Sequence, residues 1–415
     1  MTRRRLVLAA VVLAVACGPG AVVRRGAINT EVLTSVARTL ERVRGLRFTA
    51  EVPGRLLDDA EVRALLDREL AREFAPGDLE HLTAIYQQLG FLSAGTELKP
   101  AFQELYADQL AALYDPRTKT LALTKHGLRE QPTSVRLLGF FTGRDVLGEV
   151  LVAHELTHAL QDQHYGLPTT MPPLTDAQGD RMIARRALLE GDASLASVAY
   201  LRPEPLDAPT VQRFVEQVAA IPEELRARHP NIPEVIRASL AFQYNAGGGF
   251  AAAAYLHGGW PAVDAAHRDP PVSSEQVLHP EKYFDARDRP IAVALGGTEE
   301  LERQGWTRVF EDTFGELDVR VFAGRVFEPV RAGAIAAGWG GDRVRALTRG
   351  DALVIVWLSA WDTEADAIEL ADALPSLLPD ATVERRGSRV LMLLGPDTAG
   401  LAPRVWSRSR LSPTE

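Results

Sequence analysis

The HELTH segment, from His154 to His158, constrains the fold of this chain more than any other stretch. On a helix, residues four positions apart share one face, so both imidazoles point to the same place. Apolar residues on either side predict a buried helix over residues 135–163. Neutral imidazoles bind zinc well, and Glu155 lies close enough to hold a water molecule beside the metal. The pattern therefore predicts a zinc site, and the alternative is two surface histidines on an amphipathic helix.

A catalytic zinc ion needs a third protein ligand and an open fourth position. His164 follows His154 at the metzincin spacing, but Gln161 occupies the position where a glycine would have to break the helix. An unbroken helix would carry His164 away from the metal. Glu190 lies on a separate helix, expected over residues 174–201, which can pack antiparallel to the HELTH helix. We therefore predict Glu190 as the third ligand and keep His164 as the alternative.

Together, His154, Glu155, His158 and Glu190 resemble the gluzincin metallopeptidases, the thermolysin-like group. HELTHALQDQH followed by LLEGDA, with a later segment that begins at Pro270, is similar to a family of uncharacterised prokaryotic surface proteins and lipoproteins. The first resemblance implies a Zn²⁺ cofactor, a peptide or protein substrate, and Glu155 as the general base. The second resemblance brings no established substrate.

The sequence departs from the thermolysin-like pattern behind the ligands. Those enzymes place an aspartate four residues after the ligand glutamate, where this chain has Ser194. Asp192 is expected to face away from the metal. Asp162, four residues after His158, is therefore predicted to support a ligand histidine from the second layer.

Residues beyond the ligands could stabilise a developing oxyanion, because zinc peptidases of this kind often supply a histidine or tyrosine donor there. His279 is the first choice, on a short helix that Ser273 and Gln276 would cap. The same region offers a further three candidates: Tyr255, His257 and Tyr283. For each of the four, a polar loop packed on the domain is an equal alternative.

The remaining pattern predicts an α+β chain. A strand–turn–strand pattern over residues 110–124 predicts a small edge-strand sheet beside the HELTH helix, where substrate backbone can pair. Helices are expected over four further ranges: residues 28–43, 58–74, 78–89 and 211–242. Glycine and proline clusters at residues 247–249, 258–259 and 270–271 are expected to interrupt the secondary structure of that stretch.

Four regions are expected along the chain. A lipoprotein signal peptide with its lipidated cysteine occupies residues 1–17, and a tether with N-terminal helices occupies residues 18–100. A mainly helical, zincin-like catalytic domain follows over residues 101–289. A C-terminal α/β domain completes the chain over residues 290–415.

The N-terminus indicates export. Three arginines precede an apolar segment over residues 6–16, which ends at Cys17, the single cysteine of the chain. This arrangement resembles the lipobox of bacterial lipoproteins, and the alternative is a cleaved secretory signal. The lipobox implies a lipid on Cys17, which would anchor the protein in the cell envelope, at the outer membrane or cell surface. A net charge of −9 without later basic clusters argues against nucleic acid as a partner.

These observations favour a secreted, lipid-anchored zinc metallopeptidase. The alternative is a non-catalytic envelope lipoprotein for binding or assembly that keeps zinc as a structural element. A fourth protein ligand, such as His279 or His164, would close the site and favour that alternative. A metal-free scaffold is a third hypothesis.

Overall fold

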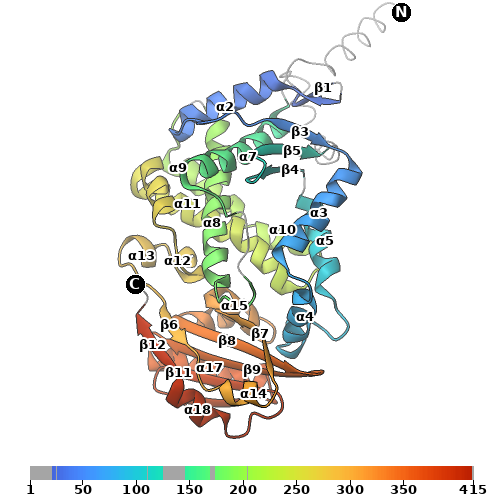
Figure 1. Ribbon diagram of the computed structural model, residues 1–415. Helices are drawn as coiled ribbons and strands as arrows, with labels where there is room; N and C mark the ends of the chain where they lie inside the picture. Colours follow the sequence, from blue (N-terminus) through green and yellow to red (C-terminus); the bar gives the residue numbers. More distant parts are fainter. Residues whose placement is uncertain are drawn as a thin grey trace, which may run out of the picture.

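The computed structural model has a mainly helical region with a small sheet at one end and a broad sheet flanked by helices at the other (Figure 1). It describes residues 21–413 except residues 25, 110, 125–144, 169–172 and 203. The expected signal peptide and Cys17 lie outside the described residues. So does the first part of the helix expected over residues 135–163. None of the described helices is long and apolar enough to cross a membrane.

The N-terminal part of the chain contains, in order, β1 (Val23–Arg24), β2 (Ala27–Ile28), α2 (Thr30–Arg44), β3 (Gly54–Leu57), α3 (Asp59–Glu73), α4 (Asp78–Gln88), α5 (Leu98–Gln109), β4 (Ala112–Asp115), β5 (Thr120–Thr124), α7 (Val146–Tyr165), α8 (Gly179–Tyr200), α9 (Ala208–Val218), α10 (Ile221–Arg228), α11 (Glu234–Arg268), α12 (Ser274–Leu278) and α13 (Glu281–Phe284).

The C-terminal part contains β6 (Ile291–Ala294), α14 (Glu299–Arg303), β7 (Thr307–Asp312), α15 (Gly315–Ala323), α16 (Pro329–Ala336), β8 (Trp339–Arg349), β9 (Ala352–Trp361), α17 (Glu364–Leu377), β10 (Thr382–Arg386), β11 (Arg389–Leu394), α18 (Leu401–Arg408) and β12 (Arg410–Pro413). The mixed helix and strand content agrees with the expected fold class.

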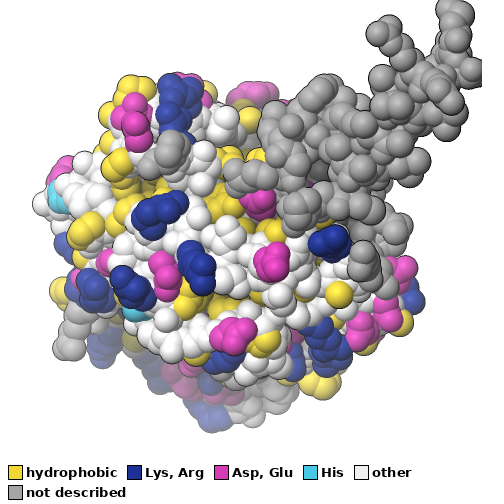
Figure 2. All heavy atoms as spheres, turned by 90° about the horizontal axis from the view of Figure 1, so that it is seen from above, with side chains coloured by type: hydrophobic (Ala, Val, Ile, Leu, Met, Phe, Trp, Pro, Cys, Tyr) yellow, Lys and Arg dark blue, Asp and Glu magenta, His cyan; other side chains and the backbone are white. Residues whose placement is uncertain are grey.

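The three N-terminal helices begin and end near the predicted positions. Asp58 caps α3, because its carboxylate accepts hydrogen bonds from the backbone N–H groups of Ala60 and Glu61. The Glu61 carboxylate in turn accepts a hydrogen bond from the Asp58 backbone N–H, which completes a capping box. Gly90 follows α4 with a φ of 75°, which is a conformation that glycine adopts without strain. On the face that carries α2, basic and acidic side chains are interspersed (Figure 2).

The predicted hairpin is present, and it forms part of a three-stranded sheet. The strand order is β3-β5-β4, so β4 is an edge strand. β4 pairs antiparallel with β5, whereas β3 pairs parallel with β5 from a distant part of the chain. β4 packs along α7, which carries the HELTH segment. The edge strand and the helix that the sequence analysis paired are therefore neighbours.

The glycines at residues 247–249 do not interrupt the chain, contrary to expectation, because they lie inside α11. A side chain at Gly191 of α8 would place its Cβ 2.0 Å from the Gly247 carbonyl oxygen. A Cβ at Gly247 would lie 2.1 Å from the carbonyl oxygen of Ala187. These glycines thus let α8 and α11 pack backbone to backbone. The real interruption of α11 is at Gly258 and Gly259, where the backbone leaves the helical conformation.

The helices expected over residues 211–242 are α9, α10 and the start of α11. Pro222 lies in the first turn of α10, and Pro233 immediately precedes α11. Proline fits the first turn of a helix but cannot donate a hydrogen bond within its interior. Both prolines therefore mark the places where new helices begin.

The C-terminal sheet has the order β10-β11-β9-β8-β7, and all its pairings are antiparallel. Successive residues of β9 face opposite sides, so Trp357 packs with α4, α15 and α17, whereas Val356 packs with α14 and α18. Leu82 of α4 and Ile236 of α11 belong to the same buried cluster as Trp357. Residues on both sides of the expected boundary near residue 290 thus share one core.

Candidate metal centre

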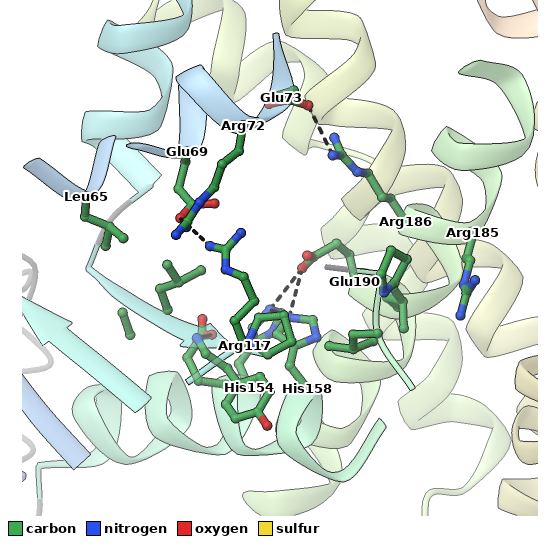
Figure 3. Close-up of a pocket in the computed structure, with 18 of the residues that line it drawn as sticks. Leu65, Glu69, Arg72, Glu73, Arg117, His154, His158, Arg185, Arg186 and Glu190 are labelled. Carbon is green, nitrogen blue, oxygen red and sulfur yellow. Dashed lines mark hydrogen bonds and ion pairs between the residues drawn. The ribbon is translucent and has the colours of Figure 1, made fainter. Parts of the chain in front are cut away.

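Three side chains from α7 and α8 converge in a cleft (Figure 3). His154 Nε2 lies 3.1 Å from Glu190 Oε2 and 3.2 Å from His158 Nε2. His158 Nε2 lies 3.5 Å from the same carboxylate oxygen. Within the described part of the chain, no fourth histidine, cysteine, aspartate or glutamate joins this group. The structure therefore brings the three predicted ligands together and leaves one side of the group open to the cleft.

The donor atoms suit a metal ion. Two imidazole nitrogens and one carboxylate oxygen, all within 4.8 Å of one another, make up the group. This is a donor set that catalytic zinc uses. Two ring nitrogens that face each other at 3.2 Å also need a cation or a proton between them, because their lone pairs point to the same place. The residues thus fit a zinc ion by chemistry and by direction.

Without a metal, the charges of the group are balanced by a proton. Burial alone would lower the pKa of His158, but the Glu190 carboxylate outweighs burial and raises it to about 10. Burial alone would raise the pKa of Glu190, but His158 and His154 hold it far below its usual value. The carboxylate is therefore ionised and the imidazole keeps its proton. A bound cation would take over the role of that proton.

Glu155 lies between the centre and the edge strand. The backbone N–H of Tyr114 in β4 donates a hydrogen bond to Glu155 Oε2 at 2.8 Å. Glu155 also lines the cleft. Its other carboxylate oxygen accepts no hydrogen bond from the residues that the structure describes. One oxygen is thus held by the strand, and the other is available to a molecule in the cleft.

The cleft has a volume of about 400 Å³ and is bounded by α3, β4, α7, α8 and α11. Two ion pairs cross it from α3 to the other walls (Figure 3). Arg117, after β4, pairs with Glu69 at 2.6 Å, and Arg186 of α8 pairs with Glu73 at 3.1 Å. Apolar side chains cover much of the remaining wall: Leu65, Leu66, Leu113, Leu167, Met182 and Leu189.

Asp162 does not support a ligand histidine, so that prediction is wrong. Its carboxylate accepts hydrogen bonds from the Tyr114 hydroxyl at 2.7 Å and from the backbone N–H of Leu167 at 3.1 Å, and it pairs with Lys119. These contacts arise because the β4–β5 hairpin folds over this part of α7. Instead, Gln161 contacts the ligand His158, with Oε1 2.9 Å from Nδ1.

Asp192 is absent from the cleft wall, but it contacts the centre indirectly, through Gln161. It is completely buried, and one of its carboxylate oxygens accepts a hydrogen bond from Gln161 Nε2 at 3.0 Å. The other oxygen lies 2.9 Å from Arg44 Nε. The reason is the position of α2, which brings a buried cation against this side of α8. Local spacing around Glu190 contains no sign of that cation.

His279 does not reach the centre, so the structure contradicts its predicted catalytic role. It follows α12, where Nε2 lies 2.9 Å from Glu316 Oε1 in α15. Packing of α12 against α15 holds it away from α7. The other predicted donors, Tyr255, His257 and Tyr283, are also absent from the cleft wall. His164 lies outside the centre too, with Nε2 2.8 Å from the Arg47 carbonyl oxygen.

Tyr244 lines the cleft, as Tyr114 does, and it was not among the residues predicted from the sequence. Its ring stacks on the His154 ring, with 6.3 Å between the ring centroids. Burial, followed by the charges of Glu190 and Glu155 and a hydrogen bond to Glu190, raises the pKa of Tyr244 well above its usual value. The hydroxyl therefore stays protonated and can donate a hydrogen bond. No local motif marks this residue, because its position depends on the packing of α11 against α8.

Comparison with known proteins finds one match, to a family model in the C-terminal region. A domain of unknown function, DUF8575, matches residues 302–398. No curated protein and no solved structure matches the chain. The matched segment contains none of the residues of the metal centre. The match therefore bears only on the C-terminal region.

Proposed function

We propose that this protein is a zinc metallopeptidase that hydrolyses peptide bonds and is held at the cell envelope by a lipid on Cys17. The observation that carries the proposal is the convergence of His154, His158 and Glu190 beside Glu155 in an open cleft. When bound there, zinc would supply a charge that lowers the pKa of bound water to about 7 and polarises the scissile carbonyl.

Glu155 acts as the general base. It takes a proton from the attacking water and passes that proton to the leaving amine. The hydrogen bond from the Tyr114 backbone fixes one carboxylate oxygen, and it leaves the other to accept the proton. A side chain held in this way loses little conformational freedom on reaction, which favours proton transfer.

The edge strand β4 aligns the substrate. Peptide groups along a strand alternate in direction, and the N–H of Tyr114 points away from β5 toward Glu155. The backbone groups of Ala112, two residues earlier, therefore point the same way, along the edge of the cleft. An extended peptide can pair with these groups as an added strand. Such pairing suits a main chain, and it supports a peptide substrate.

Tyr244 stabilises the oxyanion that forms at the scissile carbonyl. Its hydroxyl stays protonated and lies at the cleft wall beside the ligands. A preorganised donor at this place stabilises the transition state more than the ground state. The proposal thus replaces the expected His279 with Tyr244.

The openness of the centre favours catalysis over a structural zinc site. A structural site would need a fourth protein ligand. His279 and His164, the two candidates for that ligand, are bound to Glu316 and to the Arg47 backbone. Neither is directed at the centre.

The test is Glu155→Gln, which keeps the size and removes the base. We expect it to lower kcat by about 100-fold or more, while zinc stays near one ion per chain. Cleavage is measured by mass spectrometry on a mixture of peptides, and zinc by elemental analysis. The matched control is Glu281→Gln, a change at an exposed glutamate, and it should retain activity. Undiminished cleavage by Glu155→Gln contradicts the mechanism. A wild-type protein that holds zinc but cleaves no peptide favours the envelope-binding alternative.

The lipid anchor has a separate test. Cys17→Ser removes the thiol that a lipobox cysteine needs for acylation. In cells grown with radiolabelled palmitate, the wild-type chain should carry label and sediment with membranes, whereas the variant should do neither. A labelled, membrane-bound variant would rule out the anchor and leave the peptidase proposal unaffected.

A further inference from the structure

The amide of Gln161 can adopt only one orientation. Its Nε2 lies 3.0 Å from the carbonyl oxygen of Leu189 and 3.0 Å from Asp192 Oδ2. Both of these atoms are hydrogen-bond acceptors, so the donor end of the amide must face them. The carbonyl end, Oε1, is thereby directed at His158 Nδ1, 2.9 Å away. An oxygen there can only accept, and the proton must come from His158.

We propose that Gln161 is a positioning residue that determines which nitrogen of His158 binds the metal. A proton on Nδ1 leaves the lone pair on Nε2, which is the nitrogen that faces His154 and Glu190. The same hydrogen bond fixes the plane of the ring. The inference rests on the proposed function, since it concerns a metal ligand of that site.

A buried ion pair holds the amide in this orientation. Asp192 receives two hydrogen bonds from Arg44, at 2.9 Å and 3.2 Å, and lies 2.8 Å from His267 Nε2. Arg44 is only 1% exposed, and its guanidinium lies 4.6 Å from the centre of the Trp260 ring. Because both side chains are buried and paired with each other, the Asp192 carboxylate is held where it accepts from Gln161 Nε2. The carboxylate therefore cannot turn without breaking this pair.

A neutral amide, rather than a carboxylate, thus accepts the hydrogen bond from the His158 ring and sets the orientation of that ligand. The support comes from three helices besides α7: Arg44 from α2, Asp192 from α8 and His267 from α11. Gln161 also occupies the helix position that would need glycine if His164 were to bind the metal. One residue therefore excludes His164 as a ligand and orients His158.

The test compares Gln161→Met with Gln163→Met. Methionine has a similar length and no amide. Gln163 lies on the same helix but bonds to the backbone of Ala50, away from the metal. We expect Gln161→Met to weaken zinc binding about 10- to 100-fold in competition with a chromophoric chelator. The visible spectrum of bound Co²⁺ should also change in that variant. Gln163→Met should match the wild type in both measurements, and equal zinc affinity in Gln161→Met overturns the inference.

A second measurement uses the wild-type chain, so it does not depend on how a variant folds. Nitrogen NMR of zinc-loaded protein with ¹⁵N-labelled histidine should show His158 protonated at Nδ1. A proton on Nε2 overturns the inference. Zinc binding without peptide cleavage would overturn the proposed peptidase alone and leave this inference in place. A wild-type chain that binds no zinc would overturn both.

Discussion

Tyr244 illustrates how the environment of a single side chain sets its chemistry. Burial and two nearby carboxylates keep its hydroxyl protonated. The proposed role of Tyr244 depends on that hydroxyl donating one hydrogen bond. Tyr244→Phe removes that hydroxyl and keeps the ring. We expect kcat to fall about 100- to 1,000-fold, with KM and zinc content little changed. Steady-state kinetics on a defined peptide measures this. Tyr255→Phe, away from the cleft, is the control, and an equal effect of the two changes would argue against a direct role.

The residues of the centre differ in how far the sequence could predict them. The spacing of His154, Glu155 and His158 is local, because helix geometry alone places both imidazoles on one face. The sequence showed that Gln161 stands where a helix-breaking glycine would be needed, but it did not predict the contact of Gln161 with His158. Arg44 pairs with a residue 148 positions away, and no local pattern encodes such a contact.

At the scale of elements, the contact between α8 and α11 positions the centre. Gly191 follows Glu190, and its α-carbon lies against the backbone at Gly247. Gly191→Ala would force the helices apart, so we expect it to lower the free energy of unfolding by about 1–3 kcal/mol. Zinc affinity should fall as well, because Glu190 moves with α8. Chemical unfolding and chelator competition measure the two effects.

Gly249→Ala is the matched control for this contact. It lies in the same helix as Gly247, but a Cβ there would meet no atom within 4 Å. Alanine favours a helix interior over glycine by about 0.5–1 kcal/mol, so this change should be neutral or stabilising. If both alanines had the same effect, close packing would not be the reason for Gly191.

At the scale of the whole molecule, one core joins the helical region to the C-terminal sheet, and Asp318 of α15 lies near this junction. Burial, followed by the charges of Asp312 and Asp342, raises the pKa of Asp318 to about 8. Asp318 forms no hydrogen bond or ion pair with the described residues. Its ionisation therefore has no compensating partner.

The sign of the pH effect follows from this shift. An unfolded chain releases the Asp318 proton near pH 4, whereas the folded chain keeps it up to about pH 8. The folded state binds more protons in that range, so stability is lost as pH rises through it. We expect Asp318→Asn to raise the free energy of unfolding at pH 8 by about 1 kcal/mol or more, and to change it little at pH 4. Urea unfolding at several pH values measures this, with exposed Asp380→Asn as the control. An unchanged pH dependence in Asp318→Asn contradicts the prediction.

The sequence by itself determined what depends on short-range geometry. The HELTH face, the capped N-terminal helices and the β4–β5 hairpin all follow from periodicity and turn residues within one segment. The same reasoning selected Glu190 over His164. These features need only the local backbone to be known, because helix and strand geometry are fixed by the chain itself.

Tertiary structure decided which distant side chains complete the centre. Tyr244, and not His279, lines the cleft because α11 packs on α8 through glycines, whereas α12 packs on α15. Asp192 supports Gln161 from a buried ion pair because α2 places Arg44 beside it. Each of these contacts joins segments that are far apart in the chain. It depends on a buried charge or on a close approach of two backbones, and both exist only after the helices have packed.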